Sequence, residues 1–261
     1  MKQTNQKKVP LVSVVMPAYN VANYIKEAAE SVLSQSFPDL ELLIVNDAST
    51  DETAAVAEAL AAQDERVHLL TNEVNCGVAV TRNRGIAAAQ GSYIALLDGD
   101  DYWYPEKLEK QLALAERTNA DIVYCSYDLV EERENPRHRA FIVPPETSFS
   151  KMLASNVISC STVLLKAAAL EPEPFGTAKE YSEDFLLWMK LLQEGKRAVG
   201  CPEVLGAYRL MPQSRSSDKL RCARYHWKIY RKQLHLPFFR SALSFMQYAC
   251  RGMKKYIGLR R

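Results

Sequence analysis

Three aspartates in four residues, Asp98, Asp100 and Asp101, directly follow the apolar run 93–97. Carboxylates this close together repel one another, and folding alone does not require them at this position. A divalent cation would remove the repulsion, and carboxylate oxygens are ligands that suit Mg²⁺ or Mn²⁺. A metal held there could neutralise the charge that develops on a leaving diphosphate. The alternative from these residues alone is a solvated acidic turn that precedes a helix.

Other polar residues stand at the ends of two earlier apolar runs. Asp47 follows the run 41–45, where a carboxylate can accept hydrogen bonds from a nucleobase N–H or from ribose hydroxyls. An Asx-turn or a helix cap is the structural alternative. The segment 17–20 offers an aromatic ring, Tyr19, that could pack on a base.

Arg82 and Asn83 follow Gly77 on a predicted helix whose N-terminus could face phosphates. A surface salt bridge explains Arg82 equally well. Glu183 and Asp184 stand at the head of another apolar helix, where the helix dipole by itself favours acids.

Alternating strands and helices must position these side chains. Short apolar runs rich in branched residues predict buried strands at 11–16, 41–45, 67–70, 93–97 and 121–127. Helical spacing predicts helices at 23–34, 51–62 and 78–89, and from Pro105 onwards. Continuous apolar strands alternating with helices indicate a parallel sheet covered on both faces. Ligands of such a sheet bind beyond the carboxyl ends of the strands, where the polar residues above lie.

The second half of the sequence is less regular. The segment 131–147 predicts a charged loop, structure resumes at 149–154 and 160–165, and a helix is predicted over 182–194. Beyond residue 217 the chain predicts one or two basic amphipathic helices. We therefore expect a catalytic domain over 1–215, with halves at 11–105 and 106–215, followed by a helical tail over 216–261.

Taken in order, VSVVMPAYN, LLIVNDASTDET and NCGVAVTRNRGIAAAQGSYIALLDGDD resemble the N-terminal half of glycosyltransferase family 2, whose fold is called GT-A. The resemblance covers roughly residues 11–105. It implies that a nucleotide, usually a uridine diphosphate, is held by residues of the first two strand ends. It also implies that Asp98, Gly99 and Asp100 form the D-x-D motif, with Asp100 the metal ligand and Asp98 nearer the ribose. Together with Arg82 and Asn83 from the helix after Gly77, and with Arg209 discussed next, the predicted nucleotide-sugar residues are Pro17, Ala18, Tyr19, Asn20, Asp47, Arg82, Asn83, Asp98, Gly99, Asp100 and Arg209.

The resemblance is looser in the second half. Tyr181-Ser182-Glu183-Asp184 resembles the E-D motif of the family, which implies that Asp184 is the base of an inverting transfer and Glu183 its neighbouring helper. The segment 156–162 resembles a stretch that meets donor or acceptor sugar. Tyr208-Arg209, with the serines at 214, 216 and 217, resembles a stretch that closes over the diphosphate. The Q-x-x-R-W signature of processive synthases is absent, so one sugar per encounter is expected.

Composition narrows the class and the location. Of 261 residues, 48% are hydrophobic and 25% charged, which excludes a disordered chain. Six widely spaced cysteines with no C-x-x-C pair indicate reduced thiols. The sequence shows neither a signal peptide nor a run of the roughly 20 apolar residues that span a bilayer. We therefore expect a cytoplasmic protein.

The tail is basic and aromatic. A segment of this kind over 226–261 could lie on the anionic inner face of the plasma membrane, or could pack on the catalytic domain with a wet basic face. Nucleic acid is disfavoured, because acids elsewhere prevent a broad positive surface. The tail cations are Arg221, Arg224, Lys228, Arg231, Lys232, Arg240, Arg251, Lys254, Lys255, Arg260 and Arg261.

The sequence thus predicts a divalent-metal-dependent hexosyl- or N-acetylhexosaminyl-transferase. Its donor would be a nucleoside-diphosphate sugar, of UDP type, and its acceptor a glycan or lipid-linked glycan of bacterial surface polysaccharide or lipopolysaccharide. Two alternatives stay open. A haloacid-dehalogenase phosphatase also places D-x-D at a strand end, although Asp101-Tyr102-Trp103 departs from that pattern. A nucleotide-sugar-binding or membrane-docking protein without turnover is the other.

Overall fold

The computed structural model describes residues 9–131, 138–177, 182–211 and 219–257, without side-chain detail for 138, 219, 220 and 251–257. Its first half contains β1 (Val12–Ala18), α1 (Ile25–Leu33), β2 (Leu40–Asn46), α2 (Thr53–Gln63), β3 (Val67–Thr71), α3 (Val78–Ala88), β4 (Tyr93–Leu96), β5 (Tyr102–Trp103) and α4 (Lys107–Thr118). Its second half contains β6 (Ile122–Glu131), β7 (His138–Phe141), α5 (Phe149–Ala154), η1 (Cys160–Thr162), β8 (Leu164–Lys166), η2 (Ala167–Ala169), α6 (Glu183–Gln193), β9 (Ala198–Leu210), α7 (Lys219–Lys228), the π-helical turn η4 (Ile229–Gln233) and α8 (Phe238–Ile257).

One sheet runs through both predicted halves, in the order β3-β2-β1-β4-β8-β6-β9-β5, with β7 paired to β6. The strands β3, β2, β1 and β4 are parallel, as the continuous apolar runs predict. Beyond them the sheet is mixed: β8 is antiparallel to β4 and β6, whereas β9 is parallel to β6. The predicted domain boundary at residue 215 falls outside the described residues and stays a prediction.

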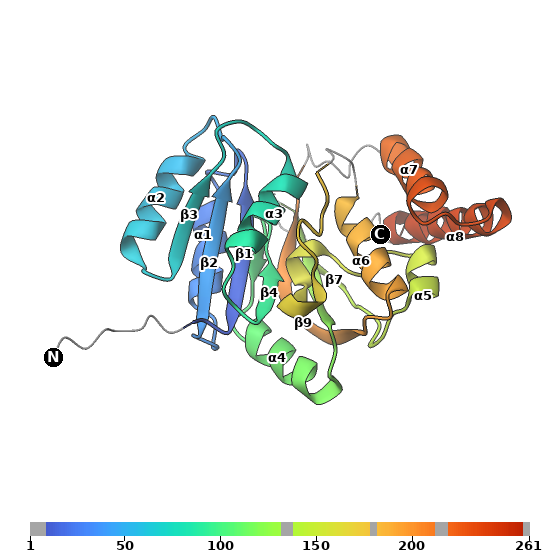
Figure 1. The fold of residues 1–261 in the computed structure, drawn as a ribbon, viewed down its shortest axis with the longest axis horizontal. Coiled ribbons are helices and arrows are strands. Elements are labelled where there is room, and N and C mark those ends of the chain that lie inside the picture. The colour runs from blue at the N-terminus through green and yellow to red at the C-terminus, as the bar shows by residue number, and fades with distance from the viewer. Residues whose placement is uncertain (1–8, 132–137, 178–181, 212–218, 258–261) are drawn as a thin grey trace.

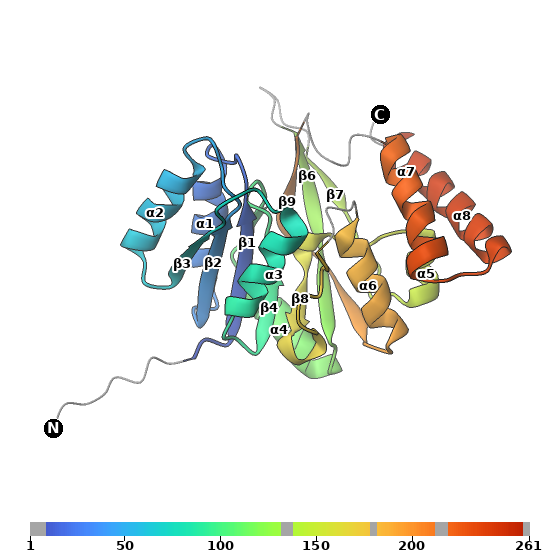
Figure 2. The same cartoon turned by 45° about the horizontal axis from the view of Figure 1, so that its top comes forward.

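Alternation along the central strand fills a core on each face of the sheet. Val12, Val14 and Met16 of β1 pack with α1, α2 and α4, while Val15 packs on the opposite face. That opposite face also holds the buried side of α6 and the turn η4. Figures 1 and 2 show α2 and β3 at one end of the molecule and α7 and α8 at the other.

The chain reverses its direction of travel across the sheet at β1, because β2 lies on one side of it and β4 on the other. Because β1, β2 and β4 are parallel, the loops that follow them leave the same edge of the sheet. The backbone N–H of Asp47 donates to the carbonyl of Ala18 (2.8 Å), and that of Leu97 to the carbonyl of Val15 (3.1 Å), which fixes the start of two of these loops. This switch point is where a parallel α/β sheet offers a ligand crevice.

Several sequence predictions are confirmed and one region differs. The five predicted strands correspond to β1–β4 and β6, and none of the six cysteines, all within the described residues, forms a disulfide. The predicted loop 131–147 contains β7, and β9 was not predicted at all. Within the described residues, no helix is both long enough and apolar enough to cross a membrane.

Candidate active site

The aspartate loop follows β4 at the switch point. Gly99 fits here because a Cβ would lie 3.1 Å from the side chain of Val21 and 3.2 Å from the carbonyl of Pro17. Asp98 and Asp100 are partly buried on either side of this glycine. Burial, followed by the charge of Asp98, raises the pKa of Asp100 to about 6. The charges of Arg209 and Arg82 only partly oppose this rise, so a cation would relieve the repulsion that remains between the two predicted metal ligands.

Asp101 has a different role from its neighbours. Its side chain is buried, one carboxylate oxygen accepts from the Ser161 hydroxyl at 2.5 Å, and the other accepts from the backbone N–H of Arg209 at 2.9 Å. Burial, with Asp100 next to it, raises the pKa of Asp101 well above its usual range. The expectation that folding requires none of the three acids is wrong for Asp101, which fastens the loop to η1 and β9.

Arg82 joins the aspartate loop to the E-D segment. Its guanidinium is buried and donates to Asp98 Oδ1 at 2.6 Å and to Glu183 Oε1 at 2.9 Å. It also lies 5.3 Å from the ring centroid of Phe175. The alternative interpretation, that Arg82 forms a salt bridge on the surface, is therefore wrong. One buried cation connects two acidic motifs 85 residues apart in sequence.

Glu183 and Asp184 form the first turn of α6, after Ser182 in a left-handed conformation (φ 62°). Glu183 is buried against Arg82, whereas Asp184 is partly buried and accepts from its neighbour Phe185 N–H at 2.7 Å. Burial, then the charge of Glu183, raises the pKa of Asp184 to about 6, and Arg82 opposes the rise. A carboxylate with this pKa is ionised at neutral pH and still basic enough to take a proton.

The loop after β1 holds the predicted nucleotide residues of the first strand end. Pro17 and Ala18 are buried at the end of β1, and Tyr19 is 48% exposed. Asn20 adopts a left-handed conformation (φ 53°), and its side-chain oxygen accepts from the backbone N–H of Thr50 at 2.8 Å. The ring of Tyr19 is thus free to meet a ligand, while Asn20 joins the loops after β1 and β2.

Asp47 is buried and holds the loop that precedes α3. Its two oxygens accept from the Asn72 side chain (2.7 Å) and from the backbone N–H groups of Cys76 (2.8 Å) and Gly77 (2.9 Å). Gly77 has a φ of 85°, which favours glycine. These partners lie 25–30 residues away, so neither an Asx-turn nor a helix cap describes Asp47. Its predicted contact with the nucleotide stays a prediction.

Asn83 is buried with both ends of its amide engaged. The side chain donates to the carbonyl of Gly176 at 2.8 Å and accepts from the backbone N–H of Phe175 at 3.0 Å. It therefore braces the loop that carries Phe175 under Arg82. Its predicted role toward the nucleotide also stays a prediction.

Arg209, on β9, lies over the aspartate loop. Its guanidinium donates to the backbone carbonyl of Asp100 at 2.7 Å and forms an ion pair with Glu27. It also lies against the rings of Tyr24 (5.2 Å to the centroid) and Tyr102 (4.8 Å). Tyr181 and the serines at 214, 216 and 217, which were predicted to act nearby, lie outside the described residues.

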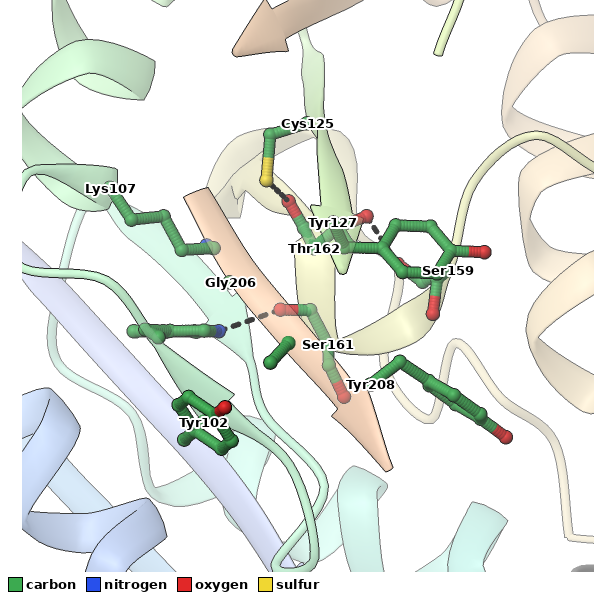
Figure 3. Close-up of a pocket in the computed structure, with 11 residues that line it drawn as sticks. Tyr102, Lys107, Cys125, Tyr127, Ser159, Ser161, Thr162, Gly206 and Tyr208 are labelled. Carbon is green, nitrogen blue, oxygen red and sulfur yellow. Dashed lines mark hydrogen bonds between the residues drawn. The ribbon is translucent and has the colours of Figure 1, made fainter. Parts of the chain in front are cut away.

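A small cavity of about 10 Å³, room for about one water molecule, lies behind this loop. Ser159, Ser161 and Thr162 line it, and the Ser161 hydroxyl is hydrogen-bonded to both Asp98 and Asp101, so the predicted sugar-contacting segment 156–162 adjoins the aspartates. Lys107 lies on one side of β9 in the view of Figure 3, and Tyr208 on the other. The Lys107 ammonium is 3.8 Å from the ring centroid of Trp103, and burial lowers its pKa to about 8.

The sequence did not predict the fastening of Asp101 by Ser161 and Arg209, nor the roles of Glu27, Tyr24 and Tyr102. The adjacency of Asp101 to the D-x-D motif was the one available signal for the first. The other partners are distant in sequence, and no local pattern marks them.

The residues present could supply some, but not all, of the ligands of a divalent cation. Asp98 and Asp100 supply oxygen ligands of the kind that Mg²⁺ and Mn²⁺ prefer. Among the described side chains there is no group of three His, Cys, Asp or Glu that could hold a metal alone. The remaining ligands would be diphosphate oxygens and water, as is usual for Mg²⁺ bound with a substrate.

Comparison with known proteins decides the family. The sequence model of the family described as glycosyl transferase family 2 matches residues 13–171, which include the loops after β1, β2 and β4. The chain belongs to glycosyl transferase family 2. This glycosyltransferase is 36% identical over 252 residues to TuaG of Bacillus subtilis (strain 168), named for teichuronic acid biosynthesis, with 97% of this chain and 99% of TuaG covered. It is 33% identical over 247 residues to the Escherichia coli UDP-Glc:alpha-D-GlcNAc-diphosphoundecaprenol beta-1,3-glucosyltransferase WfgD, with 94% and 95% covered.

Solved structures agree with the fold. S. aureus TarS 1–349 in complex with UDP-GlcNAc has a TM-score of 0.70 and 22% identity, covering 91% of this chain and 71% of TarS. The Pyrobaculum calidifontis mannosyltransferase PcManGT, in complex with GDP-Man and Mn²⁺, has a TM-score of 0.69 and 20% identity, covering 93% and 70%. The predicted GT-A-like α/β fold of the transferase is confirmed, and the phosphatase alternative is excluded.

Proposed function

We propose that this family 2 glycosyltransferase moves one sugar from a UDP-sugar to a hydroxyl of a lipid-linked glycan, with inversion at the anomeric carbon. WfgD, similar along nearly its whole length, is named for a UDP-Glc donor and a diphosphoundecaprenol-linked acceptor. TuaG is named for the synthesis of a surface polysaccharide. Both names favour bacterial surface polysaccharide synthesis. The proposed place of this synthesis is the cytoplasmic face of the membrane.

The contact of Arg82 with both Asp98 and Glu183 is the observation that supports this proposal most strongly. It brings the aspartate loop and the start of α6 into one cluster. A sugar transfer needs a site for the diphosphate of the donor and a base that takes the proton of the acceptor hydroxyl. Asp184 next to this cluster has a pKa of about 6, which suits a general base at neutral pH.

In the proposed step, the acceptor oxygen attacks the anomeric carbon from the face opposite the leaving group. A new carbon–oxygen bond forms as the bond from that carbon to the diphosphate oxygen breaks, and the electron pair leaves with UDP. Asp184 takes the acceptor proton, and Glu183, held by Arg82, keeps the start of α6 in place. The product is the glycosylated acceptor with inverted configuration.

The donor is held by loops at the switch point. Tyr19 packs on the base, Asp47 and Asn20 keep the loops after β1 and β2 in position for the uridine, and Arg209 approaches the diphosphate over Asp100. Asp98 and Asp100 would hold Mg²⁺ or Mn²⁺, which would supply positive charge to the leaving diphosphate.

A panel of UDP- and GDP-sugars, each with and without Mn²⁺, tests this function through release of nucleoside diphosphate. We expect release from one UDP-sugar, dependent on the metal and lost in Asp100→Ala. Ile142→Ala, at an exposed position directly after β7, is the matched control and retains release. Absence of both release and calorimetric donor binding would contradict the proposal and favour a docking protein without turnover.

A further inference from the structure

The outer face of α8 carries large apolar side chains. Phe239, Leu243 and Met246 are 86%, 55% and 58% exposed, and their spacing of four and three residues places them on one side of the helix. Phe238, at the start of the helix, is 57% exposed. We call these four residues the α8 face. A contiguous apolar patch of this kind marks an interaction site more often than an ordinary wet surface.

The inner side of α8, by contrast, carries two buried serines and two half-buried aromatic residues, Phe245 and Tyr248. Ser241 and Ser244 are buried there, and the Ser241 hydroxyl donates to the carbonyl of Pro237 at 3.1 Å. Tyr248 stacks on His226 with ring centroids 3.8 Å apart, and Phe245 contacts Trp227 at 5.7 Å. These contacts fix which side of the helix faces the protein. The exposed apolar side chains therefore cannot turn inward without breaking them.

The charge of the tail indicates which kind of partner the α8 face binds. Residues 219–261 contain twelve lysines and arginines and no aspartate or glutamate, which leaves 21 basic against 31 acidic residues in 1–218. Arg240 is exposed on α8 itself, and Arg231 and Lys232 are exposed just before it. Pairing of two α8 faces would bring two basic segments together, which disfavours a second copy of this chain. An apolar stripe bordered by cations fits an anionic lipid surface.

We propose that the α8 face docks on an anionic bilayer, with its apolar side chains among the acyl chains and the neighbouring cations at the headgroups. This inference rests on the proposed function only for the purpose of docking. A docked enzyme meets an acceptor that is anchored in the same membrane.

The tail is attached to the helix that carries the proposed base. His226 of α7 stacks on Phe185 of α6 with centroids 4.3 Å apart, and the Phe185 N–H donates to Asp184. Tyr230 donates from its hydroxyl to the carbonyl of Leu153 and meets Phe185 edge-on at 6.4 Å. Docking through α8 therefore holds α6 at a defined height and orientation relative to the bilayer.

Co-sedimentation of the full-length protein with vesicles tests this inference. The vesicles are phosphatidylcholine with roughly 30% phosphatidylglycerol, compared with phosphatidylcholine alone, at about 0.1 M salt. We expect binding to the anionic vesicles. The triple variant Phe239→Gln, Leu243→Gln and Met246→Gln is expected to lower the partition coefficient by at least about tenfold, because the buried apolar area is lost.

Matched controls separate docking from folding and from catalysis. Val9→Gln with Ile142→Gln changes two exposed aliphatic residues elsewhere, at 62% and 59% exposure, and is expected to leave binding unchanged. Donor hydrolysis without vesicles is expected to be the same in the triple variant as in the wild type, so failure of docking is distinguishable from failure of the transferase proposal. Equal partition of wild type and triple variant, or a dimer that the triple variant abolishes, would overturn the inference.

Discussion

Two amphipathic helices of this transferase face opposite ways. In α1 the apolar residues Ile25, Ala28, Ala29 and Val32 are buried against the sheet, as their spacing predicts. In α8 the large apolar residues Phe239, Leu243 and Met246 are exposed, while Ser241, Ser244 and the half-buried Phe245 face the protein. Periodicity therefore predicts a helix in both cases, but it does not say what covers the apolar side. For α1 the cover is the protein's own sheet, and for α8 we propose that it is a membrane.

The same contrast separates the charges of the two regions. In the catalytic domain the cation Arg82 is buried between Asp98 and Glu183, and its position depends on the fold. In the tail Arg231, Lys232 and Arg240 are exposed, and the proposed membrane docking gives them an external partner. Changes to Arg82 should alter stability and chemistry in solution, and changes to these exposed tail cations should not.

Arg82→Met should have the largest effect on stability. Removal of one partner leaves Asp98 and Glu183 without their cation, and breaking a buried ion pair costs about 3–5 kcal/mol of unfolding free energy. Chemical denaturation measures this loss. Arg82→Met combined with Glu183→Gln removes one orphaned charge and should recover part of it. An unfolding free energy of Arg82→Met equal to that of the wild type would mean that the cluster contributes no stability.

Ile25→Ala and Leu243→Ala form a matched pair on the two helices. Ile25 is fully buried, so its truncation should cost about 2–5 kcal/mol in unfolding free energy. Leu243 is 55% exposed, so its truncation should change that energy by less than about 0.5 kcal/mol. Urea denaturation of both variants in the absence of lipid makes the comparison. A large loss in Leu243→Ala would show that another part of the protein covers the α8 face.

Much of the catalytic domain could be predicted, because its signals are local. The runs 11–16 and 41–45 fall within two residues of β1 and β2. The 13-residue strand β9 escaped prediction because Gly200, Pro202 and Gly206 interrupt its apolar pattern. The candidate site was predicted as two separate motifs. What joins them, Arg82 between partners 16 and 101 residues away, is a product of the fold and leaves no pattern in the sequence.

His226 should make the attachment of the tail sensitive to acid. Burial lowers the pKa of His226 to about 3, and its Nε2 has no hydrogen-bond partner among the described residues. The unfolded chain binds a proton below its ordinary pKa of 6.5, whereas the folded chain does not. The contribution to stability is therefore present above pH 6.5 and is lost as the pH falls toward 3.

We expect His226 to lower the unfolding free energy by about 2 kcal/mol between pH 7 and pH 5. His226→Phe preserves the stack on Phe185 and should lose this part of the acid dependence. Denaturation of both proteins at the two pH values measures the difference. The same pH dependence in wild type and variant would show that His226 is not the residue that titrates.

The rate of sugar transfer should follow the ionisation of Asp184. Only the ionised carboxylate takes a proton, and its pKa is about 6. Transfer at subsaturating acceptor should therefore rise about tenfold per pH unit below pH 6 and level off above it. A pH–rate profile on the cognate donor measures this. A rate independent of pH between 5 and 7 would place the base elsewhere.

The measurement that tests the central claim most directly is transfer and donor binding by Asp184→Asn. The amide keeps the shape of the side chain but cannot accept the proton, so we expect kcat to fall by roughly 10³-fold. The donor Kd, from calorimetry, should stay within about threefold of the wild type, because donor contacts lie on the other loops. Wild-type turnover in this variant would contradict the assignment of Asp184 as the base and with it the proposed joining of the two motifs into one active site.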